Sequence, residues 1–168
     1  GLDGVIIAGY EVGGHPSADG VGTFVIARRC AADMKIPVIA AGGIADGRGV
    51  AAAFMLGAYG VQMGTRFLCA EECSIHPVYK ERILKANDLC TMVTGKRLGH
   101  PVRSLRTRFS QNYAKAEYGG MPDDELEALA TGAFRIAVQE GDIEKGCFLS
   151  GQIAAMVKKE QPAAQIVK

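Results

Sequence analysis

Short apolar runs and longer, helically spaced segments alternate over the first 68 residues. The apolar runs are Gly4–Gly9, Ile36–Ala41 and Gly60–Met63, and a glycine-containing loop follows each of them. Unbroken runs of this length are typical of strands that are buried on both faces of a parallel sheet. Between the runs, Val21–Met34 and Arg48–Leu56 have the apolar spacing of helices that pack on a sheet. The pattern predicts the order βαβαβ.

Beyond Phe67 the pattern is one of helices separated by glycine and proline. It predicts helices at Val78–Ala86, directly after Pro77, at Asp123–Glu140, with acidic residues in the first turn, and at Gly151–Lys158. We predict no further strand in this region.

The fold class that follows is α/β, and a parallel sheet of this kind is either doubly wound or closed as a barrel. The stretch Gly57–Val61, which joins a helix to a strand, is matched in residue type by Gly1–Val5 except at Tyr59 and Asp3. Residue 1 then corresponds to the end of a helix, and a complete (β/α)₈ barrel needs about 250 residues. We expect the chain to be the C-terminal part of a longer protein.

Composition narrows the class of partner. The chain of 168 residues is 48% hydrophobic and 22% charged, with a formal net charge of +1, which leaves no general excess of positive charge for nucleic acid or an anionic membrane. No apolar run approaches the roughly 18 residues that span a bilayer. We expect a cytoplasmic protein. The arginines at 103, 106 and 108, near Phe109 and Tyr113, fit a solvated helix face or a contact with an anionic cofactor better than a nucleic-acid patch.

The five cysteines are odd in number and irregularly spaced, which indicates free thiols rather than a disulfide framework. Cys69 and Cys73 have the spacing of half a zinc site, but no second Cys/His pair follows them. We therefore predict no metal.

Two glycine loops follow consecutive strands and suit a phosphate group. Gly42-Gly43 and Gly64-Thr65 allow backbone N–H groups to approach an anion, a following helix N-terminus adds positive potential, and Thr65 adds a hydroxyl. A single glycine loop after a strand often only reflects the glycine that a turn needs. Two such loops in consecutive βα units match the position at which barrels commonly bind phosphate.

The loop after the first strand carries His15 on the diglycine turn Gly13-Gly14. An imidazole at the same edge of the sheet as the phosphate loops suits a general acid or base, and the glycines admit a flat ligand. The alternative is a loop histidine that only hydrogen-bonds its neighbours. His76 and His100, each followed by proline, fit structural or substrate-lining positions.

Motifs along essentially the whole chain resemble the flavin-dependent family that contains nitronate monooxygenases and the FMN-dependent enoyl-acyl-carrier-protein reductase II. They are GYEVGGH at 9–15, IPVIAAGGIADGRG at 36–49, VQMGTRF at 61–67, HPVYK at 76–80, GHPVR at 99–103 and SGQ at 150–152. The order and spacing of these motifs make the resemblance specific to the family.

The resemblance implies a TIM barrel with FMN at the strand C-termini. Residues 1–70 would be its last βα units, about strands six to eight, residues 71–149 a helical substrate-covering segment, and residues 150–168 a helix that returns to the barrel. The implied site residues are Gly42, Gly43, Gly64 and Thr65 at the phosphate, Gly13, Gly14 and Gln152 near the flavin ring, and His15 as the catalytic histidine.

The activity that the resemblance implies first is an NAD(P)H-dependent reductase of enoyl thioesters, with a small-molecule or acyl-carrier-protein thioester as substrate; a homodimer is compatible with it. The alternative enzyme is a nitronate monooxygenase that uses O₂, and a third interpretation is a non-catalytic half-barrel fragment. Pro16–Gly20 resembles some monooxygenases, whereas 141–146 and 151–154 resemble the reductases.

Overall fold

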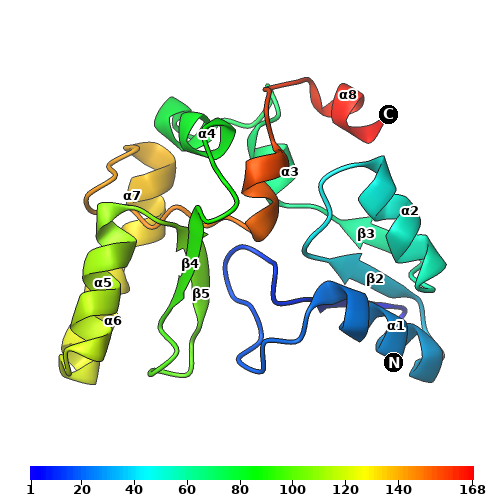
Figure 1. Cartoon of the computed structure of the whole chain (residues 1–168), viewed down its shortest axis with the longest axis horizontal. Coiled ribbons are helices and arrows are strands. Elements are labelled where there is room, and N and C mark those ends of the chain that lie inside the picture. The colour runs from blue at the N-terminus through cyan, green and yellow to red at the C-terminus, as the bar shows by residue number, and fades with distance from the viewer.

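The first part of the chain forms the predicted parallel sheet. The computed structural model describes residues 1–168, and in it β1 (Val5–Ala8), β2 (Val38–Ala41) and β3 (Gly60–Gln62) lie side by side in chain order. Both strand pairs are parallel, with Val5 opposite Val38 and Ile39 opposite Gly60. α1 (Thr23–Asp33) and α2 (Gly47–Met55) make the two crossovers (Figure 1). The predicted order βαβαβ and the α/β class are confirmed.

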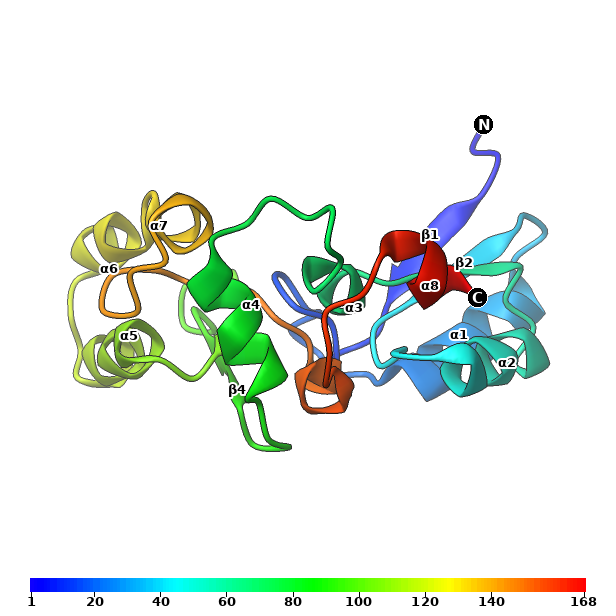
Figure 2. The ribbon, with the colours of Figure 1, turned by 90° about the horizontal axis from the view of Figure 1, so that it is seen from above.

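The two crossover helices cover one face of this sheet (Figure 2). Side chains from both layers bury each other there, among them Ile7, Ala27, Val38 and Ala53. On the opposite face Ile6 is 57% exposed, although an apolar side chain on a parallel strand is normally covered. The sheet is open, because β1 and β3 each keep one unpaired edge.

The absence of further strands was a wrong prediction. β4 (Thr91–Thr94) and β5 (Val102–Leu105) form an antiparallel hairpin, with Thr91 opposite Leu105. Their sequence does not look like a buried strand because Arg103 and Ser104, which are 3% and 1% exposed, are polar residues in interior positions.

The predicted helices differ from the structure in two places. Asp123–Glu140 is two helices, α6 (Asp123–Ala130) and α7 (Ala133–Gln139), because Gly132 adopts a φ of +76° that ends the first and starts the second. Gly151–Lys158 contains the 3₁₀-helix η1 (Gln152–Met156) rather than an α-helix.

The remaining helices complete the region beyond the sheet. α4 (Pro77–Leu84) confirms the helix predicted after residue 77, and α5 (Arg108–Tyr118), capped by Thr107, was not predicted. The short helices α3 (Thr65–Leu68) and α8 (Ala163–Val167) lie near the ends of the sheet region and the chain. None of the helices is long and apolar enough to cross a membrane.

A second core joins η1 to α4, α7 and β5, with Tyr79, Ile83, Phe148 and Val157 nearly inaccessible to solvent. In Figure 1 the orange η1 lies between the sheet and the hairpin with its helices. The protein is therefore elongated, with α1 and α2 at one end and α5 and α6 at the other (Figure 2).

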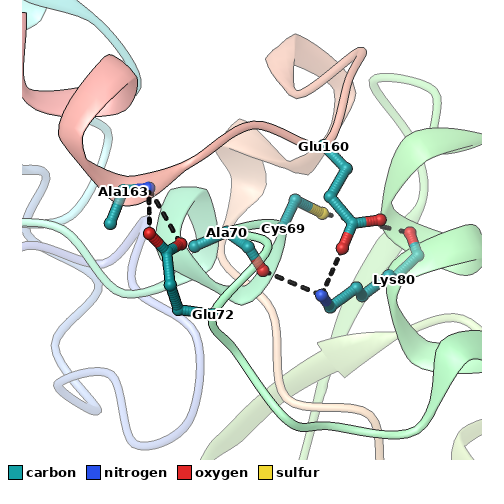
Figure 3. A network of polar contacts seen from close by, with 6 residues as sticks. All are labelled: Cys69, Ala70, Glu72, Lys80, Glu160 and Ala163. Carbon is teal, nitrogen blue, oxygen red and sulfur yellow. Dashed lines mark hydrogen bonds and ion pairs between the residues drawn. The ribbon is translucent and has the colours of Figure 1, made fainter.

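A network of polar contacts around the buried Lys80 and the exposed Glu72 ties the C-terminal segment to the rest of the chain (Figure 3). The Lys80 ammonium donates to the carbonyl of Ala70 at 2.8 Å and to the carboxylate of Glu160. The Glu72 carboxylate accepts from the N–H of Ala163 at the start of α8. Because a buried ammonium is stable only when paired, the Lys80 contacts fix the path of residues 157–163.

The uncovered sheet predicts how residues 1–168 behave when they are produced alone. Open strand edges pair with other chains, and Leu2, Phe24, Met55 and Tyr59 are exposed apolar side chains, at 72%, 69%, 88% and 75%. We expect this chain to self-associate, as measured by sedimentation velocity and light scattering. A monodisperse monomer that unfolds cooperatively would contradict an incomplete sheet.

Candidate active site

Three loops at the C-terminal ends of the strands converge on one cavity. The loop after β1 contributes Gly13, the loop after β2 contributes Gly42 and Gly43, and the turn after β3 contributes Gly64 and Thr65. The cavity has a volume of about 240 Å³, and we call it the glycine cradle. Its position is the one that ligands take in parallel α/β sheets.

Backbone donors are available in the glycine cradle. The N–H groups of Gly43 and Gly64 donate to no acceptor of the protein, and a Cβ added to Gly64 would meet no atom within 4 Å. The Thr65 hydroxyl accepts from the N–H of Gly151 at 2.8 Å, which leaves its own proton for a ligand. These groups fit an anionic oxygen group such as a phosphate.

Two N–H groups at the start of the helix that follows Gly42-Gly43 are already paired within the protein. The carboxylate of Asp46 caps α2 by accepting from the N–H groups of Arg48 and Gly49, at 3.0 Å and 3.1 Å. The expected contribution of this helix N-terminus stays a prediction, and the donors described in the cradle are loop N–H groups and Thr65.

Close backbone approach explains two of the glycines. Gly42 has a φ of +95°, and its Cβ would lie 2.8 Å from Cγ1 of Val12. At Gly13 a Cβ would lie 2.6 Å from the N atom of Gly151. Any side chain at either position would push the β1 loop away from its neighbours.

Glu11 fixes the base of the same loop. Its carboxylate accepts from the N–H and the hydroxyl of Thr23, the first residue of α1, at 2.9 Å and 3.0 Å. The N-cap residue Gly22 has no side chain to do this, so Glu11 caps α1 from a distance. The carbonyl of Glu11 also accepts from the N–H of Gln152.

Arg103 of β5 clamps the tip of the loop. Its guanidinium donates twice to the carbonyl of Tyr10, at 3.2 Å and 3.1 Å, and to the hydroxyl of Thr91 at 3.1 Å, and it lies 4.7 Å from the centre of the Tyr10 ring. The backbones of Arg103 and Gly14 exchange two hydrogen bonds. Burial lowers the pKa of Arg103, while neighbouring Tyr10 and Glu11 raise it.

His15 comes directly after Gly14 in the chain and lines a second cavity. The His15 cavity, of about 540 Å³, is lined also by His100, Thr94 and apolar side chains that include Leu98, Val102 and Phe109. Phe134 and Leu149 line both this cavity and the glycine cradle, so the two spaces adjoin. The structure thus places an imidazole beside the cradle and not in it.

Two predicted site residues lie outside the cavity walls. Gly14 is buried and pairs with Arg103, and Gln152 is exposed at the start of η1 while its neighbour Gly151 lines the cradle. Gly14 has a φ of +79°, which the tight turn before His15 requires.

The sequence did not single out the apolar walls of the site. Tyr79 is buried, donates its hydroxyl to the carbonyl of Leu149 at 2.6 Å, and lines the cradle together with Phe134 and Ile153. Burial raises its pKa, so it is present as a neutral phenol. The available signal was the HPVYK motif, in which Tyr79 is the only large aromatic residue.

Cys147 lines the His15 cavity but is not a nucleophile at neutral pH. Burial raises the pKa of its thiol to about 11, and the thiolate is the reactive form. All five cysteines are free in the structure, as predicted. No group of three or more His, Cys, Asp or Glu side chains is arranged to hold a metal ion.

Comparison with known proteins gives one consistent family. A model of the nitronate monooxygenase family matches residues 1–168. The chain is 38% identical to a probable nitronate monooxygenase of Bacillus subtilis, over 99% of this chain and 50% of that protein. It is 36% identical to one of Staphylococcus saprophyticus, over 94% of this chain and 47% of that protein.

Solved structures agree with this result. FabK from Thermotoga maritima is similar with a TM-score of 0.95 and 49% identity, over 99% of this chain and 52% of that chain. A nitroalkane oxidase from Streptomyces ansochromogenes is similar with a TM-score of 0.81 and 30% identity, over 99% of this chain and 50% of that chain. The chain therefore spans about half the length of the proteins it matches.

The Arg103 clamp leads to a prediction about loop stability. In Arg103→Lys a single ammonium group cannot replace the guanidinium that donates to both the Tyr10 carbonyl and the Thr91 hydroxyl. We therefore expect the free energy of unfolding to fall by about 2 kcal/mol. Hydrogen exchange at the amide of Gly14 should become faster. Arg135→Lys on the exposed side of α7 is the control. Equal exchange at Gly14 in both variants would show that the clamp does not hold the loop.

Proposed function

The chain belongs to the nitronate monooxygenase family, and on that premise we propose that it carries the FMN site and catalytic histidine of an NAD(P)H-dependent enoyl-thioester reductase. The observation that carries this proposal is the junction of the glycine cradle with the largely apolar His15 cavity at Phe134 and Leu149. The 49% identity to FabK supports a reductase over the nitroalkane oxidase, at 30%.

The glycine cradle would hold the FMN phosphate. The unpaired N–H groups of Gly43 and Gly64 and the Thr65 hydroxyl supply three donors, and Gly13 and Gly42 keep the backbone close. When bound, FMN would supply hydride transfer, which no protein side chain performs. Leu149 and Phe134 then separate the cofactor side from the substrate side.

The rest of the flavin site would come from further strands. We propose that β1, β2 and β3 are consecutive strands of a barrel, because they are parallel, follow in order and have both crossover helices on one face. The exposed Ile6 then points to the barrel interior, where other strands cover it.

His15 would handle the proton of the reaction. Reduction of an enoyl thioester adds a hydride equivalent to the β-carbon and a proton to the α-carbon, and an imidazole on the cavity wall can donate that proton. The Arg103 clamp fixes the turn that precedes His15, so the imidazole meets the substrate without reorganisation of the loop.

A nitronate monooxygenase is the second candidate, since the curated relatives are named as probable members of that class. In that enzyme His15 would remove the proton from the carbon next to the nitro group, and O₂ would be the oxidant. The cradle and the imidazole serve both reactions equally.

Gly64 tests the phosphate assignment. In Gly64→Leu the new side chain would occupy the open space of the cradle without a clash in the protein, so we expect a folded enzyme that has lost most of its FMN. Gly47→Leu is the matched control, because its Cβ also meets no atom within 4 Å and Gly47 lies outside the cradle. Flavin absorbance per protein measures the result, and unchanged FMN content in Gly64→Leu would refute the assignment.

His15 tests the chemistry. We expect His15→Ala in the complete enzyme to keep its FMN and to lose about 100-fold in kcat, while His100→Ala changes chiefly KM.

Anaerobic stopped-flow measurements then separate the two enzymes. If the enzyme is a reductase, NAD(P)H first reduces the flavin. A crotonyl thioester then reoxidises the reduced flavin in the absence of O₂. Reduced enzyme that ignores the thioester, together with oxidation of nitronates in air, would establish the monooxygenase instead.

A further inference from the structure

A second apolar space lies on the far side of the His15 cavity, among α5, α6 and α7. It is a groove of about 550 Å³, lined by apolar side chains that include Ala116, Met121, Ala128, Leu129, Ala133 and Ile136. Figure 1 shows these three helices at the end of the molecule that is farthest from the parallel sheet. The charged side chains on the wall of this α5–α7 groove, Glu144 and Lys145, are exposed.

The groove and the His15 cavity share part of their walls. Phe109, Tyr113 and Thr131 line both spaces. The rings of Phe109 and Tyr113 stand 6.1 Å apart between their centres, and Tyr113 is only 6% exposed. These two aromatic side chains stand between the two spaces, so the glycine cradle, the His15 cavity and the groove adjoin one another in that order.

The cradle is the most polar space of this series, and both the His15 cavity and the groove are mainly apolar. Free N–H groups and a hydroxyl face the cradle, two imidazoles face the next cavity, and mainly apolar side chains face the groove. A ligand that lies along this series has an apolar end farthest from the cofactor. From Phe109 to Ala116 the helix α5 rises by about 10 Å, which is long enough for a medium-length alkyl chain.

We propose that the α5–α7 groove receives the distal alkyl part of the substrate's acyl chain, and that Phe109 and Tyr113 set how long a chain the enzyme accepts. This inference rests on the proposed reductase function. The break at Thr131-Gly132 belongs to it, because it separates α6 from α7 and places Thr131 at the passage between the two spaces.

The test compares substrates that differ only in chain length. In the complete enzyme, kcat/KM is measured for crotonyl, octenoyl and dodecenoyl thioesters of N-acetylcysteamine. Phe109→Ala removes one of the two rings that stand between the spaces, and we expect the ratio of dodecenoyl to crotonyl kcat/KM to rise about tenfold, since each buried methylene is worth about fourfold. Phe54→Ala is the control, because Phe54 lies on α2, is 51% exposed and lines neither space.

Two filling variants test the groove from the other side. Ala116→Leu on α5 and Ala128→Leu on α6 place a larger side chain in the groove alone and reduce its free volume, so each should lower the same ratio. Binding of dodecanoyl-pantetheine, followed by calorimetry without turnover, should weaken in parallel. An unchanged ratio in Phe109→Ala and in both filling variants would overturn the proposal.

Failure of the proposed function gives a different result. If the enzyme reduces no thioester but oxidises nitronates, the same variants are compared on nitronates of ethane, octane and dodecane. A length preference that follows the groove variants supports the groove whichever reaction the enzyme performs, and equal profiles overturn it.

Discussion

The approach of the β1 loop to the hairpin and to η1 is the constraint on which the site depends. Gly13 lies against Gly151 so closely that a Cβ would be 2.6 Å from its N atom, and Gly14 pairs with Arg103 through two backbone hydrogen bonds. The guanidinium of Arg103 also holds this loop by donating to the carbonyl of Tyr10. Because the loop belongs to the sheet and its partners to the rest of the chain, these contacts join the glycine cradle to the region that carries the His15 cavity.

Arg103 fulfils this role because it is buried without a carboxylate partner. A carboxylate would satisfy the guanidinium locally, whereas carbonyl and hydroxyl acceptors oblige it to reach both Tyr10 and Thr91. The Tyr10 ring, 4.7 Å away, offers its face to the charge as a further contact. The free-energy cost of desolvating the charge is thus offset by contacts with the β1 loop and with β4. We expect the loss of any one of these contacts to loosen the turn before His15.

Local patterns predicted the parts of the fold that follow from local rules. The apolar runs gave β1, β2 and β3, and glycine after two strands located the cradle, because both signals reflect burial and backbone freedom at the residue itself. The hairpin was not predicted because its interior residues Arg103 and Ser104 are polar, and because the partners of the Arg103 guanidinium lie far away in the chain. The site's apolar walls, such as Phe134 and Leu149, come from separate segments that only tertiary packing brings together.

The chemistry that the site can perform and the substrate that it selects depend on different residues. In the proposed function, proton transfer needs one imidazole beside the cofactor, and His15 would serve equally well to protonate a reduced enoyl thioester or to deprotonate a nitroalkane. Selection between them needs differential binding, and a methyl group or a methylene contributes to it only where a wall contacts it. That wall is built by Phe109, Tyr113 and Phe134, which stand on α5 and α7 and not on the sheet. On the proposed function, substitutions in these helices would therefore change the substrate while the cradle and His15 keep the same chemistry.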